Sequence, residues 1–331
     1  MPSAQCTGCL PSPFSDAGPS LPQARQTWHH LGHNESTMSS IHASSALPIA
    51  QALLTQTATI ARRFVPPRVA RLHVPALTPG PGESAKDASF CAIELLDGSF
   101  GLSYILLGDT LDAFIRRYAG SSDARLAGAD PLQLAQGFAS TDAVARALAL
   151  AAINALTDSV WRQVGYTPPA ARNSLGDVQL LADDHLGMIG FFPPLVRQVQ
   201  ALGARLTVLE LDEAMVRRQR ERFPGVHVTL DRGELRACNK VVGTSTMLLN
   251  DTLDAMLAAA PAAQAFAVIG PSAGLWPDAL FARGVSLLGG TRITDGAQFS
   301  DAMAAGTSWS TAATKFAIAR GDWPGWERLL A

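Results

Sequence analysis

The second half of the chain alternates short apolar runs with segments of helical periodicity. The helical segments place apolar residues on one face, as Leu195, Val199 and Leu202 do before Gly203 ends their segment. Strands that alternate with crossover helices predict a doubly wound parallel sheet. The predicted strands are 187–191, 205–211, 227–230, 240–243, 265–269 and 285–288, and the predicted helices between them are 193–202, 251–259 and 277–283.

The first half of the chain has a different order, in which strands precede most of the helices. Two apolar runs flank Asp97-Gly98, a pair typical of a two-residue hairpin turn. This order predicts an α+β unit rather than a second parallel sheet. The predicted strands are 69–77, 90–96 and 100–107, and the predicted helices are 48–64, 110–119, 131–138 and 141–156.

These patterns divide the chain into three parts. Residues 1–44 are rich in Pro, Ser, Gly and His, have no apolar period, and are predicted to be a disordered tail. An α+β domain follows over 45–175, and its last residues, from 165 onward, form the linker. A Rossmann-like α/β domain occupies 177–331. The tail contains residue types that can bind a metal, namely Cys6, Cys9, His29, His30 and His33. A disordered extension without a metal site is nevertheless the favoured interpretation.

Composition and charge narrow the class of protein. The 331 residues suffice for two domains, and their net charge of -2 argues against nucleic acid or a membrane surface as a partner. The apolar run 143–156 contains Arg146 and Asn154, which predicts a buried helix rather than a membrane span. Four cysteines in a chain of this length do not make a disulfide framework, so a reducing, cytoplasmic setting is expected.

Polar and glycine residues follow several of the predicted parallel strands. In such sheets the ligand lies outside the carboxyl ends of the strands, where the strand order reverses. Glycines permit close approach of a ligand to the backbone, and hydroxyl groups orient it by hydrogen bonds. The predicted ligand-binding residues are Gly190, Phe191, Phe192, Pro193, Glu210, Asp212, Thr244, Ser245, Thr246, Asn250, Gly270, Pro271 and Ser272.

One spacing resembles a nucleotide site, and one motif argues against it. Glu210 lies 20 positions after Gly190, as does the acidic residue that binds ribose in dinucleotide sites. The first loop, however, is not Gly-x-Gly-x-x-Gly, and Pro193 and Pro194 lack the N–H groups that would bind a pyrophosphate. The loop therefore favours a ligand without a pyrophosphate, bound against Phe191 or Phe192.

Other polar residues receive structural interpretations. The sequence contains no Gly-x-Ser-x-Gly elbow, and no His follows a strand in a position to activate Ser272. The segment Asp183-Asp184-His185 precedes the first strand of the sheet, at its amino end, and is predicted to be a solvated loop. Cys238 is interpreted as a core thiol. Asn154 is expected to bond to backbone rather than to a ligand.

The ordered set of motifs resembles one known family. The segments 187–196 (GMIGFFPPLV), 208–212 (VLELD), 243–246 (GTST), 250–253 (NDTL), 268–273 (VIGPSA) and 280–284 (LFARG), with Gly289 and Asp295, are similar to the family described as “putative heavy-metal chelation”. The resemblance covers about 180–320. It implies a Rossmann-like domain preceded by a small domain that resembles the enolase N-terminal domain. It also implies a metal, or a metal-chelating small molecule, in the cleft between the two.

Two hypotheses remain open. In the first, the chain is a small-ligand binding protein that holds a transition metal (Ni, Co, Cu, Fe or Zn) or a metal chelate, in metallophore or natural-product metabolism. In the second, it is a transferase or lyase that uses S-adenosylmethionine or a similar cofactor, with Glu210 on the ribose. The sequence thus leaves open whether the protein only binds its ligand or is an enzyme. The apolar segment Trp323–Leu330 further suggests packing on a second copy in a homo-oligomer.

Overall fold

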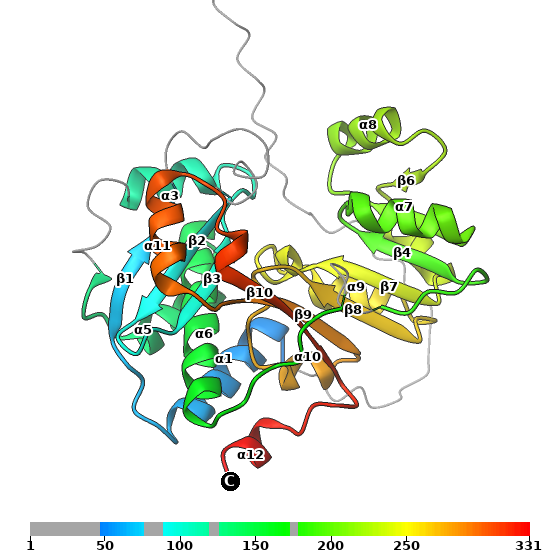
Figure 1. Ribbon diagram of the computed structural model, residues 1–331. Coiled ribbons are helices and arrows are strands. Elements are labelled where there is room, and N and C mark those ends of the chain that lie inside the picture. Colours follow the sequence, from blue (N-terminus) through cyan, green and yellow to red (C-terminus); the bar gives the residue numbers. More distant parts are fainter. Residues whose placement is uncertain (1–46, 76–88, 119–125, 173–177) are drawn as a thin grey trace, which may run out of the picture. The chain divides into compact units, whose positions relative to one another are not determined.

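Seven strands form the larger sheet of the protein (Figure 1). The structure is a computed structural model that describes residues 47–75, 89–118, 126–172 and 178–331. The strand order is β10-β9-β8-β7-β4-β5-β6, and all neighbours are parallel except β10, which is antiparallel to β9. The predicted α/β class is therefore confirmed. The strands are β4 (His185–Ile189), β5 (Arg205–Leu209), β6 (His227–Thr229), β7 (Lys240–Thr244), β8 (Ala265–Ile269), β9 (Leu287–Ile293) and β10 (Ala313–Ala319).

The helices of this half begin and end at residues suited to those positions. The Asp212 carboxylate caps the start of the helix at Glu213–Arg222 by accepting a hydrogen bond from Met215 N–H at 2.8 Å. Gly203 ends the preceding helix, Pro193–Leu202, and itself adopts the left-handed conformation, with a φ of 74°. The helices are α7 (Pro193–Leu202), α8 (Glu213–Arg222), α9 (Leu253–Ala259), α10 (Asp278–Phe281), α11 (Gly296–Ala305) and α12 (Trp326–Leu329), with short 3-10 helices η2 (Arg232–Ala237), η3 (Ser245–Leu248) and η4 (Ser310–Ala312).

A smaller antiparallel sheet precedes the large one and has the order β1-β2-β3. The predicted hairpin turn is present, with Gly98 at a φ of 76° and the Asp97 carboxylate accepting from Ser99 N–H at 3.0 Å. The elements of this half are α1 (Ile49–Ala61), β1 (Val69–His73), β2 (Phe90–Leu95), β3 (Phe100–Tyr104), α3 (Thr110–Tyr118), α5 (Pro131–Ala135), η1 (Gln136–Ala139) and α6 (Ala143–Gln163).

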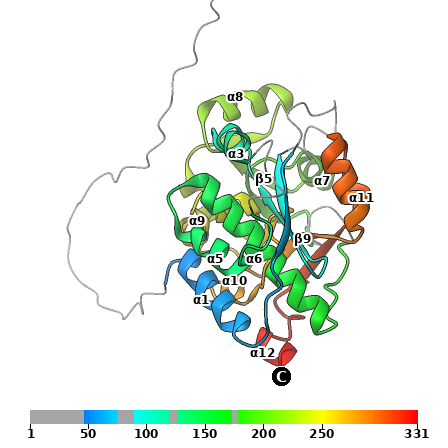
Figure 2. The same cartoon turned by 90° about the vertical axis from the view of Figure 1, so that its left-hand side faces the viewer.

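The apolar helix α6 packs on this small sheet and joins it to the large one (Figure 2). Its residues share one hydrophobic core with residues of β8, β9 and β10, such as Val268, Leu288 and Phe316. Among the described residues it is the one helix long and apolar enough to cross a membrane, but 83% of that window is buried inside the protein. The predicted buried helix is therefore confirmed, and it extends to Gln163.

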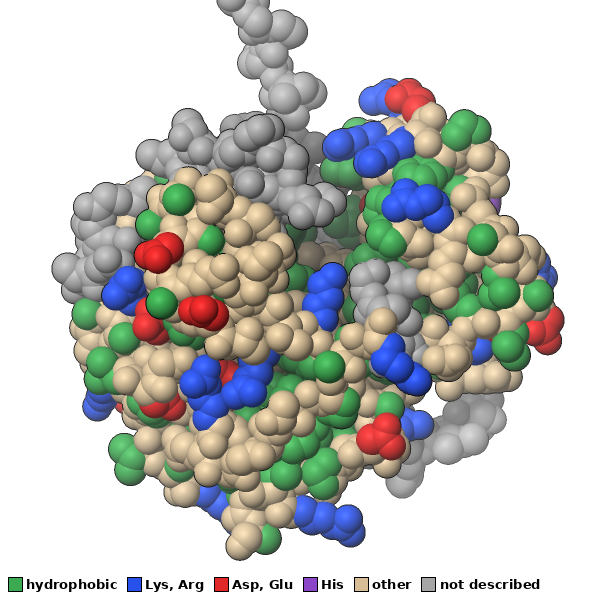
Figure 3. Space-filling model, viewed as in Figure 1, with side chains coloured by type: hydrophobic (Ala, Val, Ile, Leu, Met, Phe, Trp, Pro, Cys, Tyr) green, Lys and Arg blue, Asp and Glu red, His purple; other side chains and the backbone are tan. Residues whose placement is uncertain are grey.

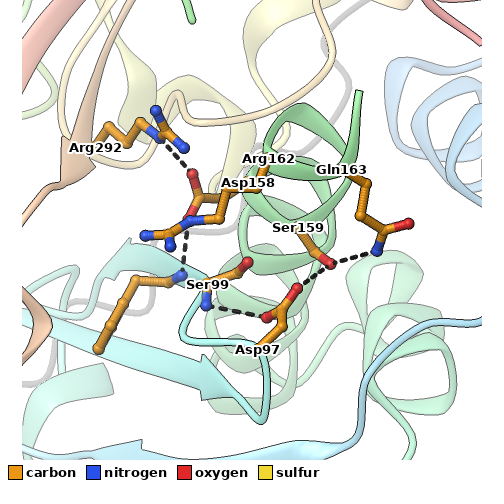
Figure 4. A network of polar contacts seen from close by, with 8 residues as sticks. Asp97, Ser99, Asp158, Ser159, Arg162, Gln163 and Arg292 are labelled. Carbon is orange, nitrogen blue, oxygen red and sulfur yellow. Dashed lines mark hydrogen bonds and ion pairs between the residues drawn. The ribbon is translucent and has the colours of Figure 1, made fainter. Parts of the chain in front are cut away.

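A buried carboxylate ties the small sheet, α6 and β9 together (Figure 4). Asp158, on α6, accepts hydrogen bonds from Phe100 N–H and Arg162 Nε at 3.1 Å each and from Arg292 Nε at 2.5 Å. Beside it, Ser159 Oγ donates to Asp97 at 2.6 Å. Because these partners come from β3, α6 and β9, the charge network fixes how the two sheets are joined.

Several elements differ from the sequence-based expectation. No element was expected between residues 212 and 227, yet α8 lies there, and α11 and β10 were also missed. The last predicted strand, 285–288, is instead β9 at Leu287–Ile293. Trp323 packs against Trp276 and Tyr166 of the protein's own core and donates through Nε1 to Asp278. A homo-oligomer is thus not needed to cover this segment and stays a prediction. The predicted disordered tail lies outside the described residues.

The segment at the amino end of β4 is only in part the solvated loop that was predicted, since Asp183 is exposed but Asp184 is buried. Asp184 is 4% exposed and accepts from Lys240 Nζ at 2.7 Å, Asn239 Nδ2 at 2.9 Å and Leu181 N–H at 2.6 Å. His185 places its ring between Ala237 O and Thr207 Oγ1. The prediction was wrong for Asp184 because two of its three partners, Asn239 and Lys240, lie more than 50 residues away, where no local pattern reveals them.

Acid should weaken this contact. Burial alone would raise the pKa of Asp184, but the hydrogen bonds from Lys240, Leu181 and Asn239 hold it below its usual value. A carboxyl with a lowered folded-state pKa adds stability above its unfolded pKa of about 3.9, and that stability is lost as pH falls through the folded value. We expect Asp184→Asn to lower the unfolding free energy at pH 7 and to flatten its fall below about pH 4. Urea denaturation across pH measures both, and an unchanged acid dependence would contradict this assignment.

Candidate ligand site at the carboxyl edge of the sheet

Three neighbouring strands end at the same level of the sheet. Ile189 of β4 pairs with Leu209 of β5 and with Gly243 of β7. The next residues, Gly190, Glu210 and Thr244, therefore lie side by side at the carboxyl edge. Because β4 and β7 are neighbours although β5 and β6 intervene in sequence, this is where the strand order reverses and where such sheets bind ligands.

The backbone turns sharply at Gly190, next to Thr244. Gly190 has a φ of 78°, and a Cβ there would lie 3.1 Å from Thr244 Cγ2. A side chain at this position would be strained in the backbone and crowded by Thr244. Both residues are half-exposed, so the two strand ends leave the backbone accessible between them.

The loop after β4 leads directly into α7. Pro193 and Pro194 occupy its first turn, and Phe192 caps it without a side-chain bond. The Phe191 ring lies 4.9 Å from the Phe223 ring, centroid to centroid, and both Phe191 and Phe192 pack partly against the core under α7 and α8. This helix start therefore offers few N–H donors and two half-exposed aromatic rings, as the sequence predicted.

Glu210 and Asp212, which follow β5, have different surroundings. Asp212 caps α8 and is thereby engaged by the protein itself. Glu210 is half-buried, and Gln219 Nε2 donates to its Oε1 at 3.4 Å. Burial raises the pKa of the Glu210 carboxyl, although bonds from Gln219 and from Leu211 N–H act in the opposite direction. Glu210 therefore remains available to a ligand, whereas Asp212 serves the helix.

Two hydroxyl groups of the loops after β7 and β8 are buried rather than open to a ligand. Ser272 is fully buried, and its Oγ accepts from Tyr104 N–H of β3 at 2.9 Å. Asn154 of α6 donates to Ser272 O and to Leu102 O, so it bonds to backbone as expected. Ser245 is 2% exposed and packs its Oγ against Gly270, where a Cβ would lie 2.3 Å away. The hydroxyls of Ser245 and Ser272 thus shape the edge from inside, beneath half-exposed Gly270 and Pro271.

The turn after η3 is held by its own residues and by α6. The Asn250 amide, with its nitrogen toward the acceptors, donates to Thr252 Oγ1, Thr246 O and Met247 O. Asp251 has a φ of 59° and lies 3.5 Å from an Arg146 nitrogen. Asn250 therefore stabilises the turn, while Thr244 and Thr246 stay half-exposed at the edge.

The described residues do not fit a metal ion bound through protein side chains alone. Within them, no three His, Cys, Asp or Glu side chains come together as a metal centre requires. Cys91 and Cys238 are both free and buried, and burial raises the pKa of the Cys238 thiol to about 11. Cys238 is thus the core thiol that the sequence suggested. The cysteines and histidines of the tail lie outside the described residues.

Two family descriptions match this chain, and both read “Putative heavy-metal chelation”. One covers residues 174–320, which include the large sheet, and the other covers 88–157, which include β2, β3 and most of α6. The chain belongs to this family. The resemblance seen in the motifs is thereby confirmed, from β4 to the loop after β10. No curated protein matches the chain.

Two solved structures of the family share this fold. One is a protein of unknown function from Pyrococcus horikoshii, with 17% identity and a TM-score of 0.60 over 82% of this chain and 99% of that one. The other, also of unknown function, is from Desulfitobacterium hafniense, with 19% identity and a TM-score of 0.58 over the same shares. At these identities the likeness supports the fold and leaves the ligand to be argued from this chain's residues.

Sequence reasoning missed two residues of this edge. Gln219 is 9% exposed and faces Glu210 from α8, and Leu230 continues β6 at the level of Glu210, because Leu209 pairs with Thr229. A signal for Gln219 exists in the sequence, since it lies three positions after Val216, on the buried face of a helix that is otherwise charged. Recognising that helix would have identified it.

Proposed function

We propose that this protein binds a metal-chelating small molecule, with or without its metal, at the carboxyl edge between β4 and β7. The observation that carries the proposal is that Gly190, Glu210 and Thr244 lie side by side at the edge of the sheet where the strand order reverses. The family description supplies the chemical class. In this function the ligand brings the metal-coordinating groups, and the protein supplies shape and hydrogen bonds.

The surroundings of the edge favour an organic chelator over a bare ion. The half-exposed rings of Phe191 and Phe192 offer an apolar wall, which suits an organic group rather than a hydrated cation. The Thr244 and Thr246 hydroxyls and the Glu210 carboxylate offer orienting polar groups next to that wall. Apolar side chains with a few placed polar groups are typical of small-molecule sites. We further propose that the protein acts in the cytoplasm.

Thermal unfolding with added ligands tests this function. Ni²⁺, Co²⁺, Cu²⁺, Zn²⁺ and Fe³⁺ would each be added free and as the citrate or histidine complex. We expect at least one complex to raise the unfolding midpoint more than its free metal does, since a ligand at about 100 times its Kd adds about 2.7 kcal/mol. No shift with any complex would contradict the proposal.

A substitution at this edge of the sheet tests whether the stabilising complex binds there. Thr244→Phe fills the space beside Gly190 and should weaken binding of the active complex by about tenfold or more, or about 1.4 kcal/mol. Thr314→Phe, on the exposed face of the edge strand β10, is the matched control and should leave binding unchanged. Equal binding by both variants would place the ligand elsewhere.

A further inference from the structure

A buried amide on the inner face of α8 has an oxygen without a hydrogen-bond donor among the described residues. Gln219 is 9% exposed, its Nε2 faces Glu210 at 3.4 Å, and its Oε1 has no hydrogen-bond partner there. A buried carbonyl left without a donor costs about 1–3 kcal/mol. Such groups are rare in native proteins and call for an explanation, of which a ligand donor is one.

The Gln219 oxygen has almost no exposed surface, so a donor from the open edge reaches it only when the Gln219 side chain turns toward Glu210 and the edge. Glu210 lies one residue beyond the paired Leu209, at the level of Gly190 and Thr244, and is half-buried under α8. The Glu210 carboxylate and the Gln219 side-chain oxygen are both acceptors, and the hydrogen bond from Gln219 Nε2 to Glu210 Oε1 links the two side chains. Two adjacent acceptors match a ligand with two adjacent donors, and a pair of neighbouring hydroxyl groups is the simplest such group.

Exposed apolar side chains border these acceptors. Leu211, Met215 and Leu230 are 46%, 39% and 39% exposed, although each lies next to the buried part of β5, α8 or β6. Leu230 also lines a surface pocket of about 600 Å³ between α8 and the end of β6, next to the acceptors but not lined by them. Its lining combines Val216, Arg217 and Arg220 with the acidic residues Glu213, Glu221 and Asp231. Figure 3 shows the Arg side chains gathered over α8. Aliphatic and guanidinium groups of this kind can stack on a planar ring.

We propose that the carboxyl end of β5 is a nucleoside subsite, in which two ribose hydroxyls donate to Glu210 and to Gln219 Oε1 while the base lies against Leu211 and Leu230. The inference deepens the proposed function, because it describes one part of the ligand at the same edge. It differs from a dinucleotide site, since Pro193 and Pro194 leave the neighbouring helix without the donors for a pyrophosphate.

Calorimetric titration of the full chain with adenosine and with 2′,3′-dideoxyadenosine tests the subsite. We expect adenosine to bind at least about tenfold more tightly, since a ligand without hydroxyls leaves the two acceptors unpaired. Catechol serves as a third probe, because it carries the hydroxyl pair without ribose or base. Tighter binding of catechol than of adenosine would overturn the nucleoside assignment, as would equal affinities for adenosine and the dideoxy compound or no adenosine binding at about 1 mM.

Two variants separate a ligand contact from a purely structural one. Gln219→Leu should lower adenosine affinity about tenfold while leaving the unfolding midpoint unchanged or higher, because it removes a buried unpaired atom. Gln200→Leu, on the exposed side of α7, is the control and should leave affinity unchanged. A lower midpoint with unchanged affinity for Gln219→Leu would overturn the proposal.

The pH dependence gives an independent readout of Glu210. A carboxylate accepts donors that the protonated acid does not, so adenosine affinity should fall as pH drops through the raised pKa of Glu210. Glu210→Gln should be weaker at neutral pH and lose this dependence, and an unchanged pH profile would contradict its role. None of these probes contains a metal, so their failure leaves the test with Thr244→Phe and metal complexes unaffected.

Discussion

Replacing Asp158 by asparagine should lower the free energy of unfolding by about 3 kcal/mol or more. The Asp158 side chain is 5% exposed and holds Arg292, whose side chain is 19% exposed, together with Arg162 and the backbone N–H of Phe100. Asparagine keeps the shape but removes the charge and turns an amide nitrogen toward donors. Two guanidinium groups then lose their buried counter-charge, which costs far more than the loss of one neutral hydrogen bond.

Urea denaturation measures the difference, with an exposed pair as the control. Arg117 and Asp142 are 2.8 Å apart, but their side chains are 46% and 42% exposed. Arg117→Gln should therefore cost no more than about 1 kcal/mol. If Asp158→Asn cost no more than this control, the network in Figure 4 would not be what joins the two sheets.

Replacing Gly101 by alanine should cost more than about 3 kcal/mol and reduce the yield of folded protein. Gly101 lies on β3 directly against α6, and a Cβ there would be 2.0 Å from Ala151 O and 2.2 Å from Ala155 N. Both atoms belong to the helix backbone, so no side chain can rotate away. The helix would have to shift, and α6 carries the core that both sheets share.

The matched control is Gly321→Ala, where a Cβ meets nothing within 4 Å. It should change the unfolding free energy by less than about 0.5 kcal/mol, as surface substitutions usually do. A similar small effect for Gly101→Ala would show that α6 does not pack on β3 as closely as described.

The large sheet was predictable because its strands are short, apolar and separated by helices. The runs at β4, β5, β7 and β8 each lie within two residues of their predicted ends, and helix α7 matches its prediction residue for residue. Burial on both faces of a parallel sheet produces such runs, so the pattern reflects the packing directly. The predicted position of the ligand edge depends only on this order.

The missed elements lack that simple pattern. Helix α8 (EAMVRRQRER) is mostly charged, and only Val216 and Gln219 are buried on it. Strand β10 begins with half-exposed and exposed residues, because it is the last strand of the sheet, with β9 on one side and a single bridge to Ala170 on the other. Gly270, Ser245 and Ser272 follow strands as expected, but β3 and α6 close over Ser272, and the sequence contains no trace of that contact. Local periodicity predicts elements, whereas contacts between distant segments decide which loop stays open.

The central claim is that a small ligand occupies the carboxyl edge between β4 and β7. A crystal structure of the protein with the metal complex that stabilises it most tests this directly. We predict ligand density bounded by Gly190, Thr244 and Glu210, with the metal coordinated by the chelator. Density at the amino end of the sheet, beside Asp184 and His185, or a metal bound only by residues of the N-terminal tail, would contradict the account.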